Sequence, residues 1–141
     1  MITDQYINQL RDVFDENDVQ LAYLFGSYAK GTESPLSDID IAVFLRNPVS
    51  HSEAFDKAVL LTHKLIGVLH KNKVDVIILN TATPPIKFNA IKDRQIIYNR
   101  DEKQRVDFEV RTMNEYFDTL YLREEYKNSL FKNIEERKFY D

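Results

Sequence analysis

One stretch, residues 24–45, constrains the fold of this chain more than any other; it reads LFGSYAKGTESPLSDIDIAVFL. An apolar run leads into Gly26 and Ser27, a polar loop follows, and Asp38 and Asp40 then open a second apolar run. We interpret the two runs as β-strands joined by a turn and a loop. Side chains on a strand alternate between the two faces of its sheet, so Asp38 and Asp40 should point to the same face.

This arrangement suits a nucleoside triphosphate bound with divalent metal. Carboxylate oxygens are ligands that Mg²⁺ and Mn²⁺ prefer, and magnesium is usually completed by waters and substrate phosphates. A Gly-Ser turn offers backbone N–H groups and a hydroxyl to phosphate oxygens. We therefore expect Gly26 and Ser27 to hold the terminal phosphates and Lys30 to neutralise the departing pyrophosphate, although a loop lysine is more often only solvated. Ser37 is a further candidate for phosphate or nucleotide binding.

A third acid, Asp75, lies in the apolar run KVDVIIL at 73–79. If this run is a strand beside the one that carries Asp38 and Asp40, the three carboxylates converge on one patch. Clustered carboxylates repel and are costly to bury unless cations neutralise them. The alternatives are an ion pair between Asp75 and Lys73 or an exposed edge position, and for the other two acids a strand-initiating turn with solvated side chains.

Two metal ions about 3.5–4 Å apart stabilise both the attacking and the leaving oxygen of an in-line displacement at phosphorus. The expected reaction is nucleotidyl transfer. In this scheme Asp38 and Asp40 bridge the two ions, while Asp75 holds the ion nearest the attacking hydroxyl and accepts its proton.

The rest of the chain predicts helices around a small sheet. Strands are expected over 19–25, 38–45 and 73–79, with a short edge strand over 95–98. Helices are expected over 3–17, 52–70, 84–90 and from 101 onward, with caps at Thr3, Ser52 and Asp101. The second helix should bury Phe55, Val59, Thr62, Ile66 and Leu69. The last should align Val106, Val110, Met113, Phe117, Leu120 and Tyr121 on one stripe.

This order predicts an α/β (α+β) fold, a small mixed sheet flanked by helices. We expect a single domain over 1–141, with a core of about 3–100 and a C-terminal helical extension of about 101–141. The extension holds more aromatic side chains than one stripe can bury in so small a domain: Phe108, Tyr116, Tyr126, Phe131, Phe139 and Tyr140. Either some of them contact a partner or a second copy, in a homo- or hetero-oligomer, or the tail folds over its own domain.

Composition narrows the class of protein. Hydrophobic residues make up 43% and charged residues 30%, as in a soluble globular protein. The net charge of -4 gives no support for a broad nucleic-acid-binding surface. The lack of cysteine excludes disulfides and thiolate metal sites. No apolar run approaches the roughly 20 residues that span a bilayer, and the start MITDQYINQL lacks a signal-peptide pattern, so a cytoplasmic protein without membrane partners is expected.

The motifs together resemble a known family. Gly26-Ser27, ten intervening residues, Asp38-Ile39-Asp40 and the later acid in KVDVI are similar to the nucleotidyltransferases of the DNA polymerase beta superfamily, and the short length resembles its minimal nucleotidyltransferase (MNT) group. The resemblance implies the polymerase-beta-like fold and the transfer of a nucleoside monophosphate from an NTP to a hydroxyl. It also implies that the metal-binding acids are Asp38, Asp40 and Asp75.

The MNT group is similar to the antitoxins of HEPN/MNT toxin-antitoxin pairs, in which the antitoxin adds AMP to a tyrosine of the HEPN ribonuclease. The resemblance thus implies a Mg²⁺-dependent antitoxin that uses ATP and has a HEPN ribonuclease as partner. Two alternatives stay open. One is a non-catalytic antitoxin that acts by binding its toxin, and the other is a transferase for a small molecule such as an antibiotic, with an acceptor pocket completed by a dimer.

Overall fold

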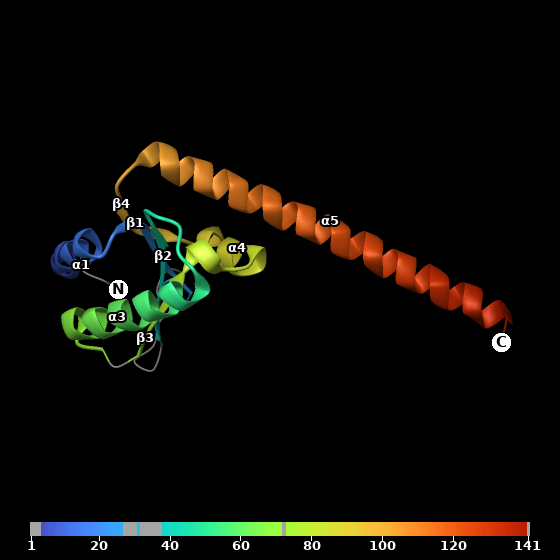
Figure 1. The fold of residues 1–141 in the computed structure, drawn as a ribbon, viewed down its shortest axis with the longest axis horizontal. Helices are drawn as coiled ribbons and strands as arrows, with labels where there is room; N and C mark the ends of the chain where they lie inside the picture. The colour runs from blue at the N-terminus through green and yellow to red at the C-terminus, as the bar shows by residue number, and fades with distance from the viewer. Residues whose placement is uncertain (1–3, 27–30, 32–37, 72, 141) are drawn as a thin grey trace.

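The computed structural model describes residues 4–26, 31, 38–71 and 73–140 (Figure 1). A four-stranded mixed sheet has the order β3-β2-β1-β4. Its strands are β1 (Val19–Phe25), β2 (Ile39–Leu45), β3 (Val74–Ile78) and β4 (Gln95–Asn99). The helices are α1 (Asp4–Glu16), α3 (His51–Leu69), α4 (Pro84–Lys92) and α5 (Glu102–Tyr140), with a 3-10 turn η1 (Leu79–Thr81). Strand β1 is antiparallel to β2 and β4, whereas β2 and β3 are parallel, so the predicted mixed α/β architecture is confirmed.

Helices cover both faces of the sheet. One face packs on α1 and α3 through a core that includes Leu24, Ile41 and Leu65. The other face packs on α4 and the first turns of α5, through residues that include Tyr23 and Phe108. All seven residues of β1 are buried, which confirms the prediction of a strand covered on both sides.

The predicted cap of α3 is wrong by two residues. The helix begins at His51, and the Ser50 side chain accepts a hydrogen bond from the backbone N–H of Glu53 at 3.1 Å. Ser50 and Glu53 have the spacing of a capping box, in which the serine at the N-cap bonds to the backbone three residues on. Ser52 has no such acid three residues after it, and it lies exposed in the first turn.

The predicted buried stripe of α3 is right at Leu69 but wrong at Phe55 and Val59. The side chains that face the sheet are Ala54, Leu61, Leu65 and Leu69, whereas Phe55 is 69% and Val59 55% exposed. Two apolar stripes run along this helix one residue, or about 100°, apart. The stripe that contains Ala54 is the one in contact, because a small residue allows the helix axis to come close to the strands.

Helix α5 starts where the sequence predicts it. The Asp101 carboxylate accepts hydrogen bonds from the backbone N–H groups of Lys103 at 3.0 Å and Gln104 at 3.2 Å, as an N-cap residue does. The predicted cap of the first helix, Thr3, lies outside the described residues.

A buried carboxylate fixes the first turns of α5 to the sheet. Glu109, only 7% exposed, accepts a hydrogen bond from the Tyr23 hydroxyl of β1 at 2.8 Å. The same carboxylate pairs with Arg94 Nε at 2.8 Å and with Arg105 Nη1 at 2.6 Å. Burial and the bond to Glu109 raise the pKa of Tyr23 far above its ordinary value, so its hydroxyl stays a donor. The cluster locks the direction in which α5 leaves the sheet.

Beyond these turns α5 runs straight away from the rest of the molecule (Figure 1). Its buried residues are Phe108, Glu109 and Thr112, and the stripe predicted from the sequence is at least 37% exposed at every position from Val106 to Tyr121. The helix is continuous over its 39 residues. The tail therefore does not fold back over its own domain, and the alternative that it does is wrong.

Candidate active site

Two of the predicted acids lie side by side on neighbouring strands. Strands β2 and β3 are adjacent and parallel, and Asp40 is in direct register with Asp75. Both side chains lie on the face that carries Ala42 and Ile77, the face covered further along by α4 and α5. Asp40 is half-buried and Asp75 is exposed at the edge of the sheet. The strand pairing on which the predicted convergence depended is thus confirmed.

The third acid lies one residue before β2. Asp38 is exposed, and its charge acts on Asp40 together with that of Asp75. Burial, followed by the charge of Asp75 and then that of Asp38, raises the pKa of Asp40 above its ordinary value. The three carboxylates are therefore close enough for Asp38 and Asp75 to act on Asp40, the most buried of the three, whose pKa is raised.

Gly26 connects the end of β1 to this acid pair. Phe25, the last residue of β1, pairs with Asp40, and Gly26 then turns the chain with φ of +70°. A Cβ atom at Gly26 would lie 2.5 Å from Oδ2 of Asp40. Only glycine combines this backbone angle with so close an approach. The loop predicted to hold phosphates therefore begins against the carboxylate predicted to hold metal.

The donor set suits a hard divalent cation in its chemistry. Carboxylate oxygens from two strands in register offer the ligands that Mg²⁺ prefers, and a cation would offset the repulsion that raises the pKa of Asp40. Over the described ranges, however, no three histidine or acidic side chains are placed so that they could hold a metal ion together. Asp40 and Asp75 are the two carboxylates that could hold such an ion, and Asp38 lies one residue before β2.

The remaining predicted site residues, Ser27, Lys30 and Ser37, lie outside the described residues, so their roles stay predictions.

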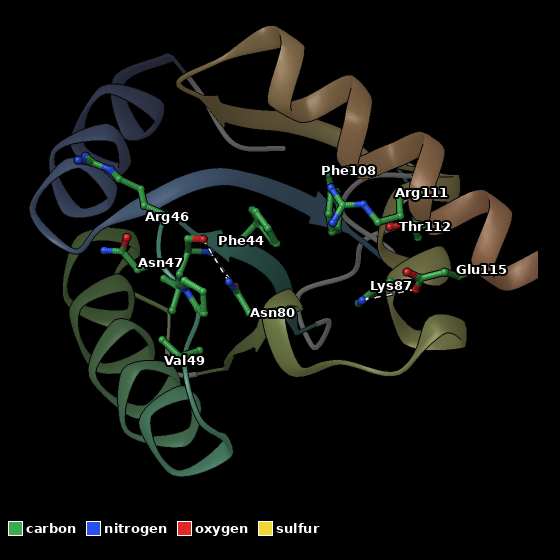
Figure 2. Close-up of a pocket in the computed structure, with 12 residues that line it drawn as sticks. Phe44, Arg46, Asn47, Val49, Asn80, Lys87, Phe108, Arg111, Thr112 and Glu115 are labelled. Carbon is green, nitrogen blue, oxygen red and sulfur yellow. Dashed lines mark hydrogen bonds and ion pairs between the residues drawn. The ribbon is translucent and has the colours of Figure 1, made fainter.

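A cavity of about 310 Å³ opens at the other end of β2 (Figure 2). Its lining comes from four separate parts of the chain and includes Phe44, Asn80, Lys87 and Arg111. Lys87 pairs with Glu115 across it at 3.7 Å, and the Asn80 amide bridges the backbone of the strand end. The cavity contains none of the predicted acids, and no sequence motif pointed to it, because its lining residues are scattered along the chain.

Comparison with known proteins agrees with the motifs. The family model described as "Polymerase beta, Nucleotidyltransferase" matches residues 8–103. The protein adenylyltransferase MntA of Shewanella oneidensis is 29% identical over 113 residues, which are 80% of this chain and 76% of that protein.

Solved structures show the same fold. A chain of a toxin-antitoxin crystal structure with AMP-PNP is 25% identical, with a TM-score of 0.71, over 89% of this chain and 98% of that one. A structure of the tri-AMPylated Shewanella oneidensis HEPN toxin in complex with its MNT antitoxin matches with a TM-score of 0.69 at 22% identity, over 92% of this chain and 99% of that chain. The resemblance stated from the Gly-Ser turn and the three acids is confirmed, and this chain belongs to the polymerase beta nucleotidyltransferase family.

Proposed function

We propose that this chain is an antitoxin that transfers AMP from ATP to a tyrosine hydroxyl of a partner HEPN ribonuclease, with Mg²⁺ as cofactor. The observation that carries the proposal is the register of Asp40 with Asp75, with Gly26 packed against the Asp40 carboxylate. Relatives named as a protein adenylyltransferase and as toxin-antitoxin complexes support the acceptor and the partner.

The chemistry assigns a role to each acid. Bound Mg²⁺ would supply positive charge at the attacking and leaving oxygens. Asp38 and Asp40 would hold this ion against the triphosphate. Asp75, exposed at the edge strand where an acceptor can approach, takes the proton of the tyrosine hydroxyl. The phenolic oxygen then forms a bond to the α-phosphorus while the bond to the bridging oxygen breaks, and pyrophosphate leaves.

The decisive experiment incubates the chain with labelled ATP, Mg²⁺ and its HEPN ribonuclease, and follows the intact mass of the ribonuclease. We expect a gain of one or more adenylyl groups, loss of the gain with EDTA, and loss with Asp40→Asn or Asp75→Asn. Asp56→Asn is the matched control, because Asp56 is an exposed acid on α3, the helix across the sheet from the acid pair.

Two results would contradict the proposal. If the ribonuclease gains no mass, yet both the wild type and Asp40→Asn protect cells, the chain neutralises its toxin by binding alone. If the label goes instead to a hydroxylated small molecule, the acceptor is wrong while the transfer chemistry stands.

A further inference from the structure

Among the described residues, nothing covers the part of α5 from Leu120 to Glu135. The last ring contacts between the helix and its domain are made by Phe88 of α4, which stacks on Tyr116 at 4.0 Å between ring centroids and meets Phe117 at 6.1 Å. Every residue from Leu120 to Glu135 is exposed. A helix that projects alone into water is marginally stable, because most helical stability in proteins comes from packing.

The exposed apolar residues of α5 follow a heptad pattern. Six of them, counted together with two charged residues between the fourth and the fifth, recur at alternating intervals of three and four residues. We call the six the heptad stripe: Val110, Met113, Phe117, Leu120, Phe131 and Ile134. Phe117 is 56% and Phe131 55% exposed. The two positions in the middle of the stripe hold Glu124 and Lys127. The Lys127 ammonium lies 5.9 Å from the centroid of the Phe131 ring, which places it on the same side of the helix. Such a pattern is typical of a two-helix seam.

The seam is complementary to itself in one orientation only. If two α5 helices lie antiparallel with the two-fold axis between residues 125 and 126, Glu124 of each copy faces Lys127 of the other. The same alignment sets Leu120 against Phe131 and Phe117 against Ile134, so apolar residues meet on both sides of the ion pairs. In a parallel alignment Glu124 would face Glu124 and Lys127 would face Lys127, so like charges would repel. We propose that the heptad stripe pairs two copies of this chain antiparallel through α5.

The position of the domain on α5 permits this pairing. Phe108 and Thr112 face the sheet, whereas Val110 and Met113 of the stripe are exposed on another side of the same turns. A second helix can therefore run along this flank of α5, where Phe117 meets Phe88 of α4 edge to face and stays 56% exposed. At 1.5 Å per residue, the two Glu109 clusters would lie about 50 Å apart. Each catalytic domain keeps its acid pair open at opposite ends of the dimer.

Charge reversal tests the pairing in the full-length chain by sedimentation velocity. We expect the wild type to sediment as a dimer at micromolar concentrations, with twice the chain mass of 16.7 kDa. Glu124→Lys and Lys127→Glu should each be monomeric, since each puts like charges opposite one another. An equimolar mixture of the two variants should recover the dimer, because every facing pair is then opposite in sign. Within each variant helix the two charges still repel, so a recovered dimer reports on pairing between chains.

A second pair of variants tests the apolar layers. Phe131→Glu should abolish the dimer. The control is Leu122→Glu, which should leave the dimer intact. Leu122 is 64% exposed and lies on the side of the helix opposite the heptad stripe. Circular dichroism should show the helical content of the wild type for Leu122→Glu, whereas monomeric Phe131→Glu should lose at most the helical signal of distal α5. A wild type that stays monomeric without its toxin overturns the proposal, as does a dimer that survives Phe131→Glu or a variant mixture that stays monomeric. The proposal does not depend on transferase activity.

Discussion

Replacing Gly26 with alanine separates the position of the Asp40 carboxylate from the stability of the fold. At φ of +70° an L-residue costs about 1–2 kcal/mol relative to glycine. The new Cβ would also stand 2.5 Å from Oδ2 of Asp40, so the carboxylate has to move. We expect the free energy of unfolding to fall by about 1–2 kcal/mol, or about 3–7 °C in Tm for a chain of this size. Transfer should fall by about a hundredfold, since a displacement near 1 Å at a reacting centre has that effect.

Gly31 provides the matched control for this variant. Its φ of +73° imposes the same backbone strain, but a Cβ there meets nothing within 4 Å. Gly31→Ala should therefore lose a similar amount of stability and keep transfer within a few-fold of the wild type. Thermal unfolding and the initial rate of adenylyl incorporation measure the two effects separately. Equal rates for the two variants would refute the idea that Gly26 sets the position of the Asp40 carboxylate.

Three further substitutions test other parts of the structure. Asp40→Asn should abolish transfer and should raise Tm at pH 7 without Mg²⁺. The folded state raises the pKa of Asp40, so the ionised carboxylate destabilises the fold at neutral pH. The gain in Tm should vanish as the pH falls below 3.8, the ordinary pKa of the group. Leu61→Ala should lower the free energy of unfolding in urea by about 2–5 kcal/mol, while Phe55→Ala changes it by less than about 0.5 kcal/mol. Glu109→Leu should lower the free energy of unfolding by about 3 kcal/mol and leave the transfer rate of the folded protein unchanged. This value is near the low end of the cost of breaking a buried ion pair, because the Arg94 side chain is 37% exposed.

The strands and the acid pair were predictable because their signals are short in range. Alternation with a period of two fixes which face Asp40 occupies, and a single crossover helix is enough to place Asp75 on the next strand. Strand β1 has the predicted bounds, Val19–Phe25. The contact of Gly26 with the Asp40 carboxylate was not predictable in the same way, since it depends on how the chain turns after the strand.

The helix faces were harder because periodicity shows that a stripe needs cover without showing what covers it. On α3 two stripes one residue apart have the same period, and the prediction placed Phe55 and Val59 in the core although both are exposed. On α5 the predicted stripe is real, but the sheet covers the neighbouring side through Phe108 and Glu109. The burial of Glu109 was not predictable, because a glutamate four residues after Arg105 has the spacing of an ordinary ion pair on a helix surface.

The acids around Asp40 and the heptad stripe of α5 are both unfavourable arrangements in the isolated chain. Burial, followed by the charges of Asp75 and Asp38, raises the pKa of Asp40 above its ordinary value. The heptad stripe leaves Phe117 and Phe131 in water, around a glutamate and a lysine that have the spacing to pair across a two-fold axis. The two proposals each supply one addition that would make the arrangement favourable, a divalent cation with its nucleotide in the first case and a second α5 helix in the second. Because Glu109 fixes α5 to the face of the sheet that carries the acids, pairing through α5 would also fix how the two active sites are presented to a toxin.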